Sequence, residues 1–139
     1  MNWNSGKLRF SILLVLVFLI FVPIVPISIV PSISLNILDE SRNPIPGLPV
    51  RQSWQHYTYQ FSGDSAEVLS DSHGIARFPE RTARISVGQL VLGQILNVVS
   101  INPHASFGPS SFFLSMGKTS GHASYSEGEP IPTEIIVKF

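Results

Sequence analysis

The feature that most constrains this chain is an apolar segment close to its N-terminus. Residues 10–30 carry no charge, and Ile12 to Val22 form an unbroken apolar run that follows Lys7 and Arg9. A basic flank before such a run is typical of an export signal, with the flank kept in the cytoplasm. About 21 residues in a helix would extend about 31 Å, against about 30 Å for the hydrocarbon core of a bilayer. We therefore expect the chain to contact a membrane through residues 8–30.

Three prolines leave two fates open for this segment. Pro23, Pro26 and Pro31 interrupt its second half, and each removes a backbone donor from a helix. The part without proline is only about 11 to 13 residues long, which is closer to the core of a signal peptide. Residues 1–31 are therefore either an uncleaved signal anchor or a signal peptide cleaved near Ser32. The first gives a single-pass protein of the cell membrane with an extracytoplasmic C-terminal domain, and the second gives a secreted or periplasmic protein.

The remainder, residues 32–139, has the composition of one small β-rich domain. Once Lys7 and Arg9 are set aside, 7 basic residues stand against 9 acidic ones, which argues against a nucleic-acid partner. Glycine and proline are frequent, at 10 and 11 residues, as expected for many short strands joined by turns. Cysteine is absent, which excludes disulfides, thiolate zinc sites and a cysteine nucleophile. No cofactor is expected.

Short stretches between turn signals predict an all-β domain of about seven strands. Ile33, Leu35 and Ile37 alternate with less apolar residues, which is typical of a strand buried on one face. Such short strands at close spacing are typical of a β-sandwich. The expected strands cover residues 33–38, 51–61, 66–70, 75–78, 111–116, 123–125 and 134–139.

The run from Ile85 to Ile101 fits two structures. At a period of two, its branched apolar residues line one face of a strand, whereas at helical spacing Val87, Val91 and Ile95 lie on one face of a helix. Glycines within the run weaken the helical interpretation.

Three of these segments resemble a known family. Residues 35–38, the turn Asn43-Pro-Ile-Pro-Gly-Leu-Pro-Val50 and the hairpin of residues 70–79 are similar to the opening of carboxypeptidase regulatory-like domains. The resemblance implies a transthyretin-like, Greek-key β-sandwich over residues 32–139, often extracellular and rarely catalytic by itself. It covers residues 34–79 well and the remainder poorly.

The second half also resembles a set of uncharacterised bacterial membrane-linked proteins. The shared blocks are residues 78–82, 104–109 and 132–135. This similarity favours a short helix within residues 86–96 and assigns no activity.

Histidines are the side chains with the most potential for chemistry. None of His56, His73, His104 and His122 has a second histidine three or four residues away, so the spacing predicts no metal site. His104 and His122 each begin a His-Ala-Ser-aromatic pattern, and either could activate a nearby serine or hold a metal. No nucleophile-elbow pattern surrounds these serines, so no catalytic residue is assigned.

A candidate binding surface combines three aromatic residues with two of the histidines. Trp54, Tyr57 and Tyr59 could stack against a sugar or a peptide beside His104 and His122, although aromatic strands more often face a core.

We therefore predict a membrane-anchored, exported, non-catalytic β-sandwich that acts as a binding or envelope-assembly module with a protein or carbohydrate partner. One alternative is a secreted or periplasmic hydrolase or metal-binding protein that uses His104 or His122. Another is a domain that docks onto a larger transporter or enzyme by adding a strand at an open sheet edge.

Overall fold

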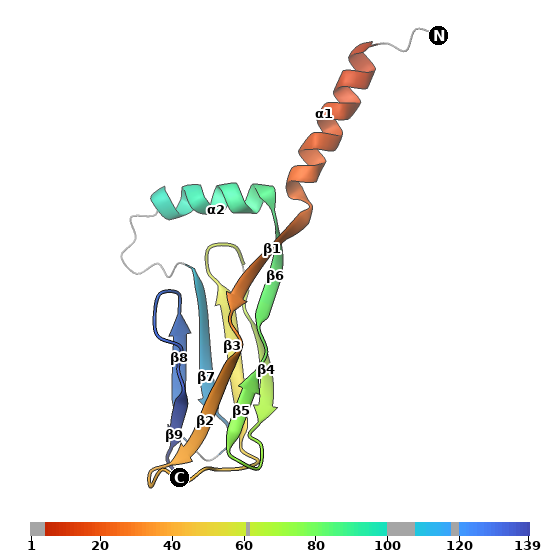
Figure 1. Ribbon diagram of the computed structural model, residues 1–139. Coiled ribbons are helices and arrows are strands. Elements are labelled where there is room, and N and C mark those ends of the chain that lie inside the picture. The colour runs from red at the N-terminus through yellow and green to blue at the C-terminus, as the bar shows by residue number, and fades with distance from the viewer. Residues whose placement is uncertain (1–4, 61, 100–107, 118–119) are drawn as a thin grey trace.

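The fold is a β-rich body with two helices at one end. A computed structural model describes residues 5–60, 62–99, 108–117 and 120–139, which contain two helices and nine strands arranged in three sheets. Helix α1 (Ser5–Phe21) projects from one end of the body, and α2 (Val87–Val99) lies across the same end (Figure 1). The predicted β-rich class is confirmed.

Two of the sheets contain the seven expected strands. In one sheet β2 lies between β5, with which it pairs antiparallel, and β9, with which it pairs parallel. In the other sheet the order is β4-β3-β7-β8, and every pair is antiparallel. The bounds are β2 Ile33–Asp39, β3 Pro49–His56, β4 Asp64–Leu69, β5 Ile75–Phe78, β7 Pro109–Ser115, β8 His122–Ser126 and β9 Glu134–Val137.

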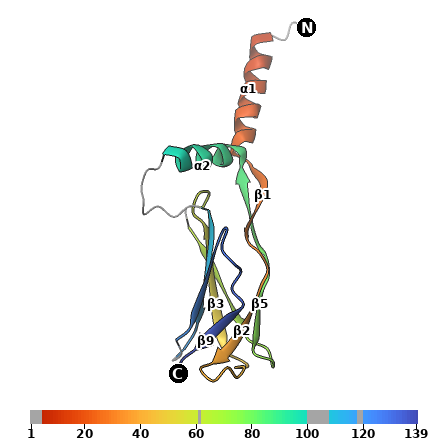
Figure 2. The same cartoon turned by 60° about the vertical axis from the view of Figure 1, so that its left-hand side comes forward.

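The hydrophobic core lies between these two sheets, whose strands run along the length of the body (Figure 2). The alternating apolar residues of β2 and Val50 of β3 are at most 1% exposed. Phe78 of β5 and Phe113 of β7 meet edge to face, with ring centroids 5.0 Å apart. The period-two pattern of the sequence therefore identifies the buried face of β2 correctly.

The third sheet is a two-stranded ribbon that joins the helices to the body. Its strands β1 (Pro23–Val30) and β6 (Arg81–Ser86) pair antiparallel. Ile29 and Val30 at the end of β1 are 2% and 0% exposed and belong to the core. Neither strand was predicted. A continuous helix over residues 10–30 is not formed: as the prolines indicated, the helix stops before Pro23, and residues 23–30 form a strand, since prolines are tolerated in a ribbon of two edge strands.

Helix α1 covers only part of residues 8–30, the segment that was expected to contact a membrane. It ends at Phe21, two residues before Pro23. In the described part of the chain, neither helix has the length and apolar character that crossing a membrane requires. The expected transmembrane helix is therefore not found.

Helix α2 confirms the helical interpretation of residues 86–96 and extends to Val99. Its start is fixed by a reciprocal pair of hydrogen bonds. The backbone N–H of Gln89 donates to Ser86 Oγ (3.1 Å), and the backbone N–H of Ser86 donates to Gln89 Oε1 (2.8 Å). Such a capping box satisfies two donors at a helix start and stabilises the helix despite its glycines.

Strand β3 ends five residues earlier than predicted. The N–H groups of Tyr59 and Gln60 both donate to the carbonyl of His56, at 3.0 and 2.8 Å. These bonds close a turn, so Tyr57 and Tyr59 lie beyond the strand rather than on it.

Candidate functional site

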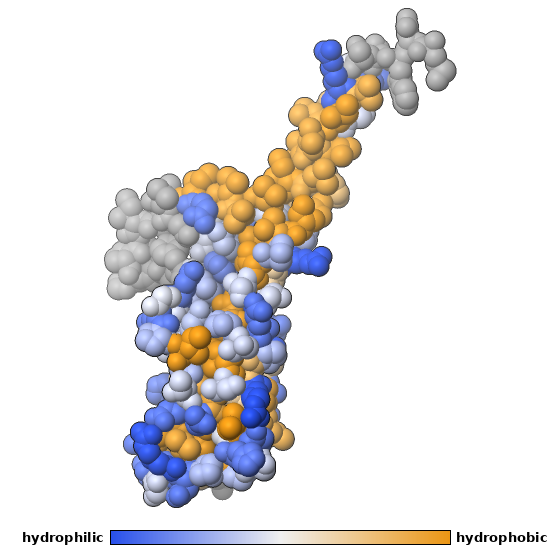
Figure 3. All heavy atoms as spheres, viewed as in Figure 1, coloured by the Kyte–Doolittle hydropathy of each residue, from blue (hydrophilic) through white to orange (hydrophobic). Residues whose placement is uncertain are grey.

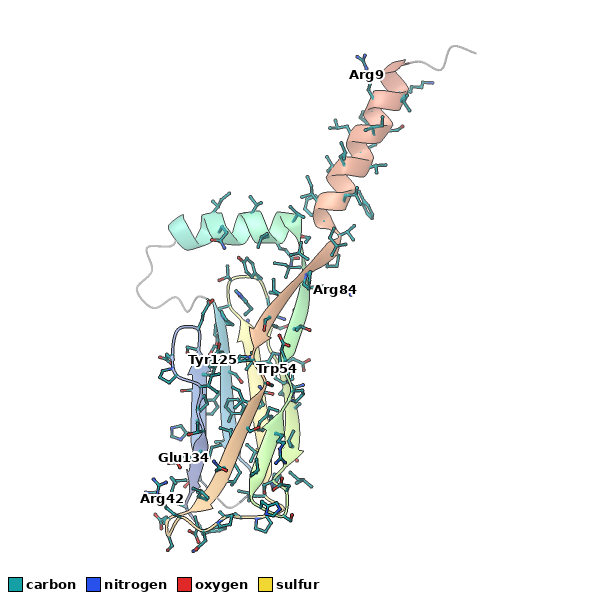
Figure 4. All side chains as sticks on the ribbon, in the orientation of Figure 1. Arg9, Arg42, Trp54, Arg84, Tyr125 and Glu134 are labelled. Carbon is teal, nitrogen blue, oxygen red and sulfur yellow. The ribbon has the colours of Figure 1, made fainter. Side chains whose placement is uncertain are left out.

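The aromatic residues of the predicted binding surface point in different directions. Trp54 lies against the core, and the guanidinium of Arg81 stacks 4.1 Å from the centre of its ring (Figure 4). Tyr57 is exposed. Tyr59 packs against His56, with 4.4 Å between ring centroids, and its hydroxyl accepts a hydrogen bond of 2.7 Å from Gln94 Nε2 of α2.

The two histidines of that surface lie elsewhere. His122 is exposed on β8 and stacks on Phe112 of β7, with ring centroids 5.8 Å apart. His104 lies outside the described residues. Within the described ranges, no group of three or more His, Cys, Asp or Glu residues is placed to hold a metal ion. The structure therefore does not bring the predicted set together among the residues that it describes.

A cavity of about 580 Å³ lies between α2 and the body. His56 borders it, is 9% exposed, and its Nδ1 has no hydrogen-bond partner among the described residues. Burial lowers the pKa of His56, against a smaller opposing effect of Glu127, so the ring is neutral at pH 7. A neutral imidazole here can hydrogen-bond a small polar group. The cavity is lined by Ile27, Ser28, His56, Thr58, Tyr59, Leu90, Gln94, Gly108 and Glu127.

The most extensive unusual surface is the apolar one at the helical end. Every large apolar side chain from Leu8 to Phe21 is between 44% and 70% exposed. On α2, whose side chains are described for residues 87–95, four apolar side chains are 40% to 56% exposed, and we call them the outer face of α2. They are Val87, Val91, Leu92 and Ile95.

The apolar surfaces of the two helices are continuous. A Cβ atom on Gly88 would lie 3.1 Å from Ile20 Cγ2, so the first turn of α2 touches the last turn of α1. The space-filling view shows apolar residues over α1 and along α2, in contrast to the mostly polar surface of the body (Figure 3). We call this surface, made of α1 and the outer face of α2, the helical end.

Sequence reasoning found only part of the helical end. It identified the apolar run of α1 but did not assign an outward face to α2. The available signal was the spacing of Val87, Val91 and Ile95, which places three branched apolar residues on one stripe of a helix. That spacing does not show which way the stripe points.

Comparison of the chain with protein-family models, curated proteins and solved structures finds no match. These comparisons support no assignment to carboxypeptidase regulatory-like domains, which the sequence resembles. The geometry of the helical end is the feature that carries a functional conclusion.

Proposed function

We propose that this protein is attached to a membrane through α1 and holds its β body in the aqueous space beside that membrane as a non-catalytic binding or assembly module. One observation carries this proposal: α1 is apolar on all sides, and its side chains are exposed. A helix that is apolar all round is normally buried in protein or in lipid. Among the described elements, the contact between the two helices joins Gly88 in the first turn of α2 to Ile20 in the last turn of α1. Lipid is then the cover for the rest of the helix.

The charges of the first residues agree with this arrangement. Lys7 and Arg9 precede the uncharged part of α1, and no acidic residue occurs before Asp39. Arg9 lies at the end of α1 farthest from the body (Figure 4). Basic residues at the end of an apolar helix bind anionic headgroups, and they favour the cytoplasmic side. We propose an extracytoplasmic β body on the basis of these charges, and not of the length of α1, which ends at Phe21.

The packing of β1 supports attachment over cleavage. A signal peptidase cut near Ser32 would remove Ile29 and Val30, which are almost fully buried, and would leave β6 without its partner strand. The proposed mature protein therefore retains its leader at least from Pro23 onward.

The strand order supports the finer proposal of a Greek-key β-sandwich with transthyretin-like connections. Strands β2 to β5 and β7 to β9 form its seven strands, and neighbours in a sheet are often distant in sequence, as β3 and β7 are. The chain passes from one sheet to the other between β2 and β3, between β4 and β5, between β5 and β7 by way of β6 and α2, and between β8 and β9. These crossings are the feature that distinguishes such a sandwich from simple meanders.

The proposed partner surface of the body is the outer face of the four-stranded sheet beside the edge strand β8. Phe112 and Leu114 are 44% and 41% exposed there, next to the stacked ring of His122. An edge strand can also accept a strand from a partner. This surface fits a protein partner better than it fits a substrate.

A vesicle flotation experiment tests the proposed attachment. The full chain is reconstituted with phosphatidylcholine and phosphatidylglycerol vesicles, and a double variant replaces Leu14 and Phe18 of α1 by arginine. The matched control replaces Leu69 and Leu114, two exposed leucines of the body, by arginine. We expect the natural chain and the control to float and to resist alkaline extraction, and the α1 variant to remain in the dense fraction. Flotation of the α1 variant, or failure of the natural chain to float, contradicts the proposal.

A further inference from the structure

Helix α2 is amphipathic in the opposite sense to an ordinary surface helix. One of its polar side chains bonds to the body, since Gln94 donates to the hydroxyl of Tyr59, whereas Gln89 is used in the cap at Ser86. Gly93 packs against the ring of Tyr59, so this side of the helix lies on the body. A surface helix in water normally buries its apolar stripe and exposes its polar one. Here the apolar stripe is turned outward.

The outer face of α2 forms one continuous apolar stripe. Val87, Val91 and Ile95 follow one another at intervals of four residues, and Leu92 widens the stripe. The sequence contains no Asp, Glu, Lys or Arg between Arg84 and Lys118, so the outer face carries no charge. Its four side chains are all branched and aliphatic, so they offer no hydrogen-bond donor or acceptor to a partner.

Resting on the attachment of α1 proposed above, we propose that α2 is a second lipid-contacting element, which lies in the plane of the membrane surface with its outer face at the boundary between headgroups and acyl chains. The two helices diverge at a wide angle in both ribbon views, so α2 runs along a surface into which α1 inserts (Figures 1 and 2). Interfacial helices bury one apolar face about 5–10 Å into this boundary.

Two observations favour lipid over a protein as the occupant. The outer face is continuous with the apolar surface of α1 through the contact of Gly88 with Ile20. Arg84, an exposed residue of β6, lies on the body side of the corner where the helices meet (Figure 4), where its cation could reach a lipid phosphate. The cation and the uncharged stripe together match the polarity gradient of a bilayer surface. A second copy of the chain would explain the stripe but not its continuity with α1.

Single-cysteine labelling of the full chain tests this inference, because the natural chain contains no cysteine. Val91→Cys and Ile95→Cys place an environment-sensitive fluorophore on the outer face of α2, where both side chains are more than half exposed. Leu14→Cys reports on α1, and Leu69→Cys, at 62% exposure on β4, is the aqueous control. Each labelled protein is reconstituted in vesicles of phosphatidylcholine and phosphatidylglycerol, with and without lipids brominated near the headgroup. Thermal unfolding of each protein checks its fold.

We expect the labels at positions 91 and 95 to shift their emission to shorter wavelength, to be quenched by the brominated lipid and to be protected from iodide. The label at position 69 should show the reverse. Aqueous labels at 91 and 95 beside a lipid-embedded label at 14 would overturn this inference and leave the attachment of α1 in place. Protection from iodide without quenching by lipid would also overturn it, because it assigns the face to a protein contact. An aqueous label at 14 would contradict the proposed function itself.

Discussion

The two ends of this molecule are closed in opposite ways. At the end far from the helices, which we call the distal end, turns are held by polar side chains that bond to the backbone. Ser70 Oγ accepts from the N–H of Leu48 (2.9 Å) and donates to the carbonyl of Ile45 (2.7 Å). Asp71 accepts from the N–H groups of His73 and Ile75 and pairs with Arg77. At the helical end the corresponding surface is apolar and exposed.

This difference shows at which end the exposed surface is satisfied without a further partner. Turn groups at the distal end satisfy their hydrogen bonds internally or in water, as Arg42 and Glu134 do at 3.0 Å (Figure 4). Apolar area of the extent seen on α1 and α2 is rare on soluble proteins and marks a surface that something covers. The distal end is therefore adapted to water, and the helical end to a less polar surrounding.

The largest effect is expected from two truncations that divide the helical end. Removal of residues 1–31 deletes β1, and the loss of Ile29 and Val30 from the core lowers the free energy of unfolding by about 3–6 kcal/mol. Removal of residues 1–21 takes away, among the side chains that the structure describes there (residues 6–21), only exposed ones, and should leave the stability of the body close to its original value. Urea denaturation of both proteins measures the difference. Equal free energies of unfolding for the two truncated proteins would contradict this prediction, because they would show that the ribbon does not unfold together with the rest of the body.

At the distal end, a glycine pair separates backbone strain from crowding. Gly74→Ala places a side chain at a φ of 75° and within 2.7 Å of Pro44 Cβ, and we expect a loss of about 2–5 kcal/mol. Gly47→Ala has a similar φ of 72° but open space around its Cβ, so only the strain of about 1–2 kcal/mol applies. Thermal or urea unfolding compares the two. A loss of stability in Gly74→Ala no greater than that in Gly47→Ala would show that the turn moves to relieve the contact with Pro44.

Acid should weaken the distal end through Asp71. Hydrogen bonds from the backbone of Ile75 and from Arg77 lower the pKa of Asp71 to about 2, from an ordinary value of 3.8. A carboxylate with a lowered pKa stabilises the fold above pH 3.8, and this contribution is lost as the pH falls toward 2. The urea midpoint should decrease over that window, and less so in Asp71→Asn. Glu129→Gln, an exposed change, should follow the natural chain.

At the helical end, the smallest expected effect comes from His56 at milder pH. Burial lowers its pKa below 6.5, so the unfolded chain binds a proton that the folded chain resists. Stability is fully present above pH 6.5 and decreases as the pH falls through the folded pKa. His56→Gln should flatten this dependence of the thermal midpoint, whereas His122→Gln, on the exposed β8, should not. Identical profiles for both variants would show that His56 titrates as in water.

Much of the body could be predicted from local patterns. The alternation in β2 depends only on which side of one strand is buried, and the capping pair Ser86 and Gln89 marks the start of α2 locally. The ribbon could not be predicted in the same way. Prolines in β1 and the charged residues of β6 hide any alternation, and their pairing joins residues more than fifty positions apart.

The site was less predictable than the body because tertiary contacts decide what each aromatic residue does. Trp54 is only partly buried, packed against the core on one side and stacked with Arg81, and the pattern of β3 does not predict this contact. Tyr59 is held by Gln94 of α2, a residue 35 positions later in the sequence. Binding surfaces depend on which side chains remain outside after folding, and local sequence does not state this.

The parallel pairing of β2 with β9 has a consequence for the order of folding. Asn36 and Glu134 are adjacent in the sheet although they lie far apart in the sequence, and Ile135 and Val137 complete the core against residues made about a hundred positions earlier. Closing a contact of such long range is slow and comes late. Strand β9 is also the last of the described strands to be synthesised, and it completes the sheet beside β2, the first strand of the sandwich. The core between the two sheets is therefore complete only once residues 134–137 are available to pair with β2.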